Sequence, residues 1–148
     1  MPQVVSSPLV MVIDDEATIR SVFSAALEFG GYATSEAKTA EEAIALLAAG
    51  VKPSAVFLDL RMPGMGGLGF LLHLRAQPDG GQVPVAVITG DSSLDPTTRS
   101  AVEALGGIVC FKPLQMDDVL RVARQLLRGR GARRTVSRRA PVRRTVSR

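Results

Sequence analysis

The sequence predicts one α/β domain with a parallel β-sheet, and three observations support this prediction. Five short apolar runs alternate with segments of helical periodicity between residues 9 and 127. Glycine follows each helical segment, where a left-handed backbone conformation commonly ends a helix. The length of 148 residues, of which 46% are hydrophobic, suits a single domain with one core. Alternation of strands with helices is typical of parallel sheets with right-handed crossover connections.

The expected strands are short apolar runs, which occupy residues 9–13, 32–36, 55–58, 85–88 and 108–111. None of these runs approaches the ~20 apolar residues that a membrane-spanning helix needs. The first eight residues lack the positive charge and the apolar stretch of a secretory signal. The single cysteine excludes an internal disulfide. A cytoplasmic protein without a membrane span is therefore expected.

Two of the expected helices begin with recognisable capping residues. Thr39 and Glu42 have the spacing of a capping box, in which each side chain accepts a hydrogen bond from the other residue's backbone N–H. Asp95 precedes Pro96, as expected for an N-cap followed by proline at the first helical position. The first and last helices each show one apolar face. These faces comprise Ile19, Val22, Phe23, Ala26 and Leu27 in the first helix, and Met116, Val119, Leu120, Ala123, Leu126 and Leu127 in the last.

Charged and hydroxyl side chains follow four of the expected strands, at the point where each strand ends. Asp14 and Asp15 follow the first strand and Asp59 follows the third. Thr89 follows the fourth strand and Lys112 the fifth. Because the carboxyl ends of parallel strands share one edge of the sheet, we expect these side chains to converge. The alternative is that the acids are merely solvated, but their joint arrival at one edge favours a site.

A cluster of carboxylates needs a cation, because like charges in close contact repel each other. Oxygen ligands suit Mg²⁺, which proteins commonly hold with one or two carboxylates and several waters. A lysine ammonium and a hydroxyl beside such a cation bind and neutralise phosphoryl oxygens. An aspartate in this setting is able to act as a nucleophile and form an acyl phosphate.

Four short motifs carry these side chains: VIDDE at residues 12–16, FLDLRMPGM at 57–65, VITG at 87–90 and FKP at 111–113. Together they resemble the receiver domain of two-component response regulators, over residues 8–128. The resemblance implies a doubly wound, flavodoxin-like fold with five parallel strands in the order 2-1-3-4-5. It also implies a signalling protein that is not an enzyme, apart from Mg²⁺-dependent self-catalysed phosphotransfer and dephosphorylation at Asp59.

The resemblance assigns a role to each side chain of the cluster. Asp59 is the expected phosphoacceptor, and Thr89 and Lys112 are expected to contact the phosphoryl oxygens. The expected Mg²⁺ ligands are Asp14, which acts mainly through water, Asp15, Asp59 and the backbone carbonyl of Arg61.

The sequence departs from the family pattern at three positions. Val109 stands where receivers usually carry a switch aromatic, three residues before the lysine, so we expect a weaker coupling between Thr89 and that position. Gly66 and Gly69 stand where Asp and Glu are frequent. Since glycine lowers helix stability by ~1 kcal/mol relative to alanine, we expect a loosened start to the third helix.

The resemblance divides the chain into an N-terminal extension at residues 1–7, a receiver domain at 8–128 and an arginine-rich tail at 129–148. The segment after the receiver is too short for a helix-turn-helix output domain, so a stand-alone receiver or phosphorelay shuttle is expected. Its phosphodonor would be a phosphohistidine on a sensor histidine kinase or a histidine phosphotransfer protein. Its downstream protein target would dock on the fourth helix, the fifth strand and the fifth helix.

Charge is divided sharply along the chain. Residues 1–127 carry a net charge of −5, whereas residues 128–148 carry nine arginines and no acid, a net charge of +9. A basic tail with few large apolar side chains is expected to be disordered. Two alternative functions therefore stay open. One is a receiver-like scaffold that binds partners without phosphate, suggested by Val109, and the other is a receiver-regulated polyanion (nucleic acid) binder that uses the tail.

Overall fold

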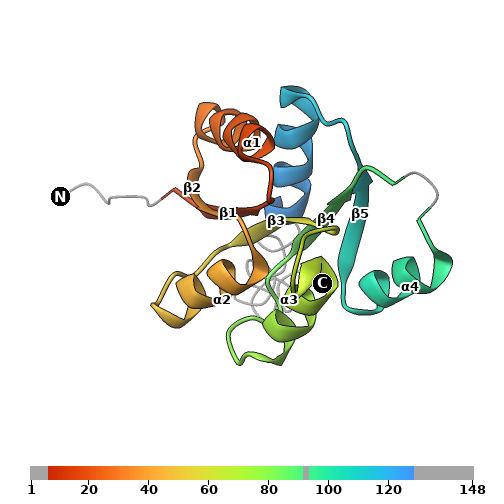
Figure 1. Ribbon diagram of the computed structural model, residues 1–148. Helices are drawn as coiled ribbons and strands as arrows, with labels where there is room; N and C mark the ends of the chain where they lie inside the picture. The colour runs from red at the N-terminus through yellow and green to blue at the C-terminus, as the bar shows by residue number, and fades with distance from the viewer. Residues whose placement is uncertain (1–6, 92–93, 129–148) are drawn as a thin grey trace, which may run out of the picture.

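A five-stranded parallel sheet with helices on both faces forms the core of the chain (Figure 1). The computed structural model describes residues 7–91 and 94–128. The strands lie in the order β2-β1-β3-β4-β5, and all neighbouring pairs are parallel. They are β1 (Leu9–Ile13), β2 (Ala33–Ala37), β3 (Ala55–Asp59), β4 (Val85–Thr89) and β5 (Gly107–Phe111). The predicted doubly wound α/β fold and its strand order are confirmed.

Helices cover the sheet in two layers. One layer holds α1 (Ala17–Phe29) and a C-terminal helix over residues 116–128. The other holds α2 (Ala40–Ala48), α3 (Gly66–Ala76) and α4 (Pro96–Ala104). Each layer has its own apolar cluster against the sheet. No helix within the described residues is both long enough and apolar enough to cross a membrane.

The two central strands, β3 and β4, consist of short runs of buried residues. Every residue of β3 and β4 is buried, because helices pack on both faces of a parallel sheet. On the α1 side, the rings of Phe23 and Phe57 meet edge to face with centroids 5.9 Å apart. On the other side, Phe70 and Leu71 of α3 are fully buried. The polar groups at the strand ends therefore rest on a rigid, well-packed base.

Two residues that the sequence predicts on the apolar faces of helices, Val22 and Met116, are exposed. Val22 is 49% exposed, because the buried stripe of α1 is shifted around the helix so that Ser24 takes the inward position. Met116 is 44% exposed, while Val122, which the sequence pattern did not single out, is buried in the C-terminal helix. The second strand is also displaced by one residue, since it begins at Ala33.

The helix caps follow the prediction with one change. The Thr39 hydroxyl accepts a hydrogen bond from the Glu42 N–H at 2.9 Å, as expected. The Glu42 carboxylate accepts its bond from Lys38 N–H at 2.7 Å and not from the N-cap amide, so the capping box is displaced by one residue. Asp95 caps α4 by accepting from Thr98 N–H at 3.0 Å. The predicted disorder of the tail concerns residues 129–148, which lie outside the described residues.

Arg75 joins three segments at the amino edge of the sheet. Its guanidinium donates to the carbonyls of Leu105, Gly80 and Val83, at 2.7, 2.9 and 2.7 Å. Burial lowers the pKa of this guanidinium. The three carbonyls supply the polar surroundings that a partly buried cation requires. The end of α3 is thereby tied to the α4–β5 turn and to the segment before β4.

Candidate functional site

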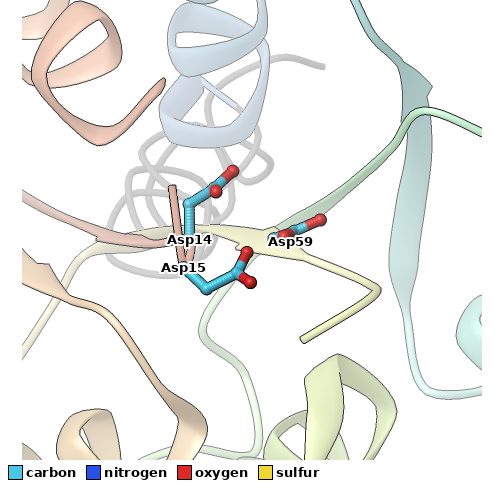
Figure 2. A group of neighbouring side chains, drawn as sticks. All are labelled: Asp14, Asp15 and Asp59. Atoms are coloured by element: carbon cyan, nitrogen blue, oxygen red, sulfur yellow. The ribbon is translucent and has the colours of Figure 1, made fainter. Parts of the chain in front are cut away.

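The carboxyl ends of β1 and β3 bring three aspartates together, as the strand-end pattern predicts. Figure 2 shows Asp14 and Asp15 leaving the end of β1 beside Asp59 at the end of β3. One carboxylate oxygen from each residue lies within 4.8 Å of the others. Asp14 and Asp59 are buried, with 2% and 6% exposure, while Asp15 faces solvent. The cluster is therefore reached from solvent at Asp15.

Lys112 completes the cluster from the end of β5. Its Nζ lies 3.3 Å from Asp14 Oδ2 and 3.6 Å from Asp59 Oδ1. Burial of Lys112 disfavours its charged form, but the carboxylates of Asp59 and Asp14 outweigh that effect, so the pKa of Lys112 is raised. The backbone N–H of Lys112 donates to the carbonyl of Thr89 at 2.8 Å, which fixes the base of the side chain.

Asp59 is held in conditions that oppose its ionisation. Burial, followed by repulsion from Asp14, raises the pKa of Asp59 to about 7. A hydrogen bond with the Asp15 side chain acts in the same direction. Lys112 and the backbone N–H of Arg61 act in the opposite direction without cancelling the rise. A cation placed among these carboxylates would favour the ionised form.

Thr89 lies at the end of β4 and is completely buried. Its Oγ1 accepts a hydrogen bond from Asp91 N–H at 3.1 Å. A hydroxyl that accepts one bond keeps its own hydrogen for another acceptor. Asp91 also forms an ion pair with the Arg61 side chain, so the loop after β3 and the loop after β4 are joined beside the cluster.

The loop after Asp59 fits closely against α3. The N–H of Gly67 donates to the carbonyl of Leu60 at 3.1 Å. A β-carbon at Gly67 would lie 2.4 Å from the carbonyl oxygen of Asp59. Gly66, with φ of +78°, has the left-handed conformation that favours glycine. The first turn of α3 therefore approaches the Asp59 backbone as closely as glycine permits.

Sequence reasoning missed one residue that supports this loop. Glu41, in the first turn of α2, accepts a hydrogen bond from Met65 N–H at 3.2 Å. Met65 is the N-cap of α3 and makes no side-chain cap of its own. Glu41 thus supplies the cap from a neighbouring helix. No sequence signal indicates this contact, because it joins residues 24 positions apart.

The donor set fits a divalent cation that prefers oxygen. Three carboxylates offer oxygen ligands, two of them buried and one exposed toward solvent. This combination suits Mg²⁺, which keeps several of its waters. The structure thus brings together Asp14, Asp15, Asp59 and Lys112, with Thr89 at the end of β4 and Arg61 on the loop after β3.

Comparison with known proteins gives a consistent result. The family model described as "Response regulator receiver domain" matches residues 10–124. The transcriptional regulatory protein PrrA of Mycobacterium leprae is 33% identical over 133 residues, which cover 90% of this chain and 55% of that protein. The response regulator MprA of Mycolicibacterium vanbaalenii is 31% identical over 119 residues, or 80% of this chain and 50% of that protein. The chain thus spans about half the length of these curated relatives.

Solved structures show the same architecture. The chemotaxis protein CheY4 of Vibrio cholerae superposes with a TM-score of 0.75 at 25% identity, covering 82% of this chain and 100% of that one. NtrX of Brucella abortus superposes with a TM-score of 0.79 at 30% identity, covering 88% of this chain and 29% of that one. The likeness extends over the sheet and both helical layers.

Proposed function

The chain belongs to the response regulator receiver domain family, and we propose that it accepts a phosphoryl group on Asp59 in a Mg²⁺-dependent phosphorelay. The observation that carries this proposal is the contact of one lysine with two of three clustered aspartates. Lys112 Nζ lies 3.3 Å from Asp14 and 3.6 Å from Asp59, within the same group of carboxylates. Such an arrangement of anions and one cation suits a site that receives a further anion with a metal ion.

The proposed transfer is a nucleophilic displacement at phosphorus. A carboxylate oxygen of Asp59 attacks the phosphorus of a phosphohistidine, the P–N bond breaks, and the imidazole nitrogen leaves with the electron pair. Mg²⁺ in the site would supply positive charge that favours ionised Asp59 and neutralises the transferred oxygens. Water then hydrolyses the acyl phosphate, which restores Asp59 and releases inorganic phosphate.

The other side chains have supporting roles in this proposal. Asp15, Asp59 and the Arg61 carbonyl would hold the cation directly, and Asp14 would act through water. Lys112 moves its ammonium from the Asp59 carboxylate to a phosphoryl oxygen, and the Thr89 hydroxyl donates to another. Asp14 remains beside Lys112, so the lysine stays charged and correctly placed.

The proposal also covers the setting of the domain. We place the receiver at residues 8–128 in the cytoplasm, with a sensor histidine kinase or histidine phosphotransfer protein as donor. Its output passes by protein–protein contact through α4, β5 and the helix at residues 116–128. Phe111, 37% exposed at the end of β5, offers apolar surface on that face.

Labelling with a small phosphodonor tests the assignment of Asp59. The full chain is incubated with acetyl phosphate and Mg²⁺, and the acyl phosphate is located by mass spectrometry. Asp59→Asn is expected to remove the label, whereas the control Asp79→Asn, at an exposed acid distant in sequence, keeps it. Undiminished labelling in Asp59→Asn would show that another residue is the acceptor. Absence of label in the wild type would favour the phosphate-independent scaffold.

A further inference from the structure

Arg20 in the first turns of α1 reaches back to the end of β1. Its NH1 donates to the backbone carbonyl of Asp14 at 2.8 Å. Its Nε lies 3.4 Å from Glu36 Oε1 on β2. The Arg20 side chain is only 17% exposed, so the guanidinium is fixed by packing as well as by these two contacts.

The carbonyl that Arg20 holds belongs to the peptide between Asp14 and Asp15. Because a peptide unit is planar, a fixed carbonyl also fixes the direction of the next N–Cα bond. The preceding peptide is held by Asp14 N–H, which donates to Ala37 O at 3.1 Å. The Asp14 carboxylate is held by Glu16 N–H at 2.9 Å and by Lys112. Asp14 is therefore restrained at its backbone N–H, its backbone carbonyl and its carboxylate.

Asp15 differs from Asp14 in this respect. Its side chain is exposed, and one of its carboxylate oxygens lies within 4.8 Å of a carboxylate oxygen of Asp59. The direction of the Asp15 side chain depends on the peptide after it, which Glu16 N–H anchors to Asp14 Oδ1 at 2.9 Å, and on the peptide plane before it. That plane is the one whose carbonyl accepts from Arg20.

We infer that Arg20 is a positioning residue for the cation site, which holds the Asp14–Asp15 peptide so that the Asp15 carboxylate faces Asp59. This inference rests on the proposed function, because the cluster has to bind a divalent cation. Arg20 acts through the backbone and touches neither the cation nor the phosphoryl group. Groups that orient ligands in this way commonly affect metal affinity 10–100-fold, by the order of magnitude seen at other metal sites.

The chemistry of arginine fits this role better than that of lysine. A guanidinium offers several N–H donors in one plane, so it contacts Glu36 and the Asp14 carbonyl at once. A lysine ammonium at the same position has a single nitrogen for both acceptors. The bond to the carbonyl is the shorter of the two contacts, and the Glu36 side chain is 40% exposed, so the ion pair is the weaker one.

A purely structural role for Arg20 would join α1 to β2 without affecting the cluster. Glu36→Gln separates the two roles, because it weakens the contact with β2 and leaves the bond to the Asp14 carbonyl in place. Arg20→Gln removes both contacts. Arg20→Lys keeps the charge and most of the apolar stem, and it serves as the second variant if Arg20→Gln does not fold.

Isothermal titration of the full chain with MgCl₂ measures the affinity, and urea unfolding without Mg²⁺ measures stability. We expect about a 10-fold weaker Mg²⁺ affinity in Arg20→Gln and Arg20→Lys, and less than about a 2-fold change in Glu36→Gln. An unchanged affinity in a folded Arg20 variant would overturn the inference and leave the proposed function intact. Equal losses in Glu36→Gln and Arg20→Gln would also overturn it. A wild type that binds no Mg²⁺ would overturn the proposed function and the inference together.

Discussion

The Glu41 carboxylate on α2 caps α3, because it accepts the N–H of Met65 at 3.2 Å. A helix N-terminus has unsatisfied N–H groups, and a carboxylate there also interacts favourably with the helix dipole. This contact ties α2 to the loop that follows Asp59. The acid at the N-terminus of α3 thus comes from another helix, while Gly66 and Gly69 supply none within the first turn.

Glu41→Ala is expected to lower the free energy of unfolding by about 0.5–1 kcal/mol, as for the loss of an exposed helix cap. Urea denaturation followed by circular dichroism measures the change. Glu103→Ala is a suitable control, since Glu103 is also an exposed helical glutamate and its partner, Arg99, lies on the same helix. The control should change stability by no more than about 0.5 kcal/mol. Equal effects in the two variants would contradict the capping role.

The raised pKa of Asp59 predicts how stability without Mg²⁺ depends on pH. The folded-state pKa of about 7 exceeds the ordinary aspartate value of 3.8, so the folded protein binds more protons than the unfolded chain between these pH values. Stability is therefore greatest below about pH 4 for this group and falls as pH rises toward 7, by an amount on the order of a few kcal/mol. Urea unfolding at several pH values, with Asp59→Asn as the control, measures this slope. A wild-type slope identical to that of the variant would contradict the prediction.

Asp15→Ala is expected to weaken Mg²⁺ binding while raising the melting temperature measured without Mg²⁺. The reason is that Asp15 is one member of a repelling cluster and contributes to the raised pKa of Asp59. Thermal melts with and without Mg²⁺ test both effects on the same samples. If Mg²⁺ fails to stabilise the wild type, the carboxylates do not form a metal site.

The fifth strand is expected to respond weakly to phosphorylation. Val109 packs against the core beside Val87 and carries no large ring that is able to change position. The aromatic residue of β5 is instead Phe111, which is exposed and pairs with Thr89 in the sheet. The Arg99 guanidinium lies 5.8 Å from the centre of the Phe111 ring. Amide hydrogen exchange with and without beryllofluoride, a mimic of the aspartyl phosphate, should change mainly in the loops of Thr89 and Lys112. Large protection changes within β5 and α4 would contradict this prediction, because they would show that Val109 does not reduce the rearrangement on phosphorylation.

The arginine-rich segment should give the chain a salt-dependent affinity for polyanions. Nine arginines within residues 128–148 would release counterions from nucleic acid, with a dissociation constant on the order of 10⁻⁴–10⁻⁶ M at physiological salt. No aromatic residue is present in this segment to stack on bases, so binding should not depend on base sequence. Duplex DNA binding by the full chain is compared with that by a chain ending at Leu127. Equal binding by both chains would exclude the segment as the cause.

The fold and the convergence of the cluster were predictable because they depend on short-range pattern. Apolar runs fix the central strands, and parallel pairing then places Asp14, Asp59 and Lys112 at one edge. The outward position of Val22 was not predictable. The spacing of apolar residues in a helix defines an apolar face, but it does not show which residues at the margin of that face contact the sheet.

Contacts between distant polar groups were also beyond the sequence pattern. Arg20 is an ordinary surface-type residue in a helix, and only the packing of α1 beside β2 brings its guanidinium to Glu36, which lies 16 positions away. The same holds for Arg75, whose acceptors lie in the segment of Gly80 and Val83 and at Leu105, 30 positions away. These contacts arise from tertiary geometry, which residue type and spacing do not encode.

The close approach of Gly67 to Asp59 reverses the usual rule for improving a helix. Alanine in place of a helical glycine normally adds about 1 kcal/mol of stability. At Gly67 the added methyl group would overlap the carbonyl oxygen of Asp59, at 2.4 Å, so α3 and the acceptor strand would have to move apart. Evolution and protein engineering therefore face the same restriction here, because a residue that favours the helix displaces the aspartate. At Gly69 an added β-carbon would instead lie 2.4 Å from Cγ of Met65, so alanine there improves the helix only if the flexible Met65 side chain shifts.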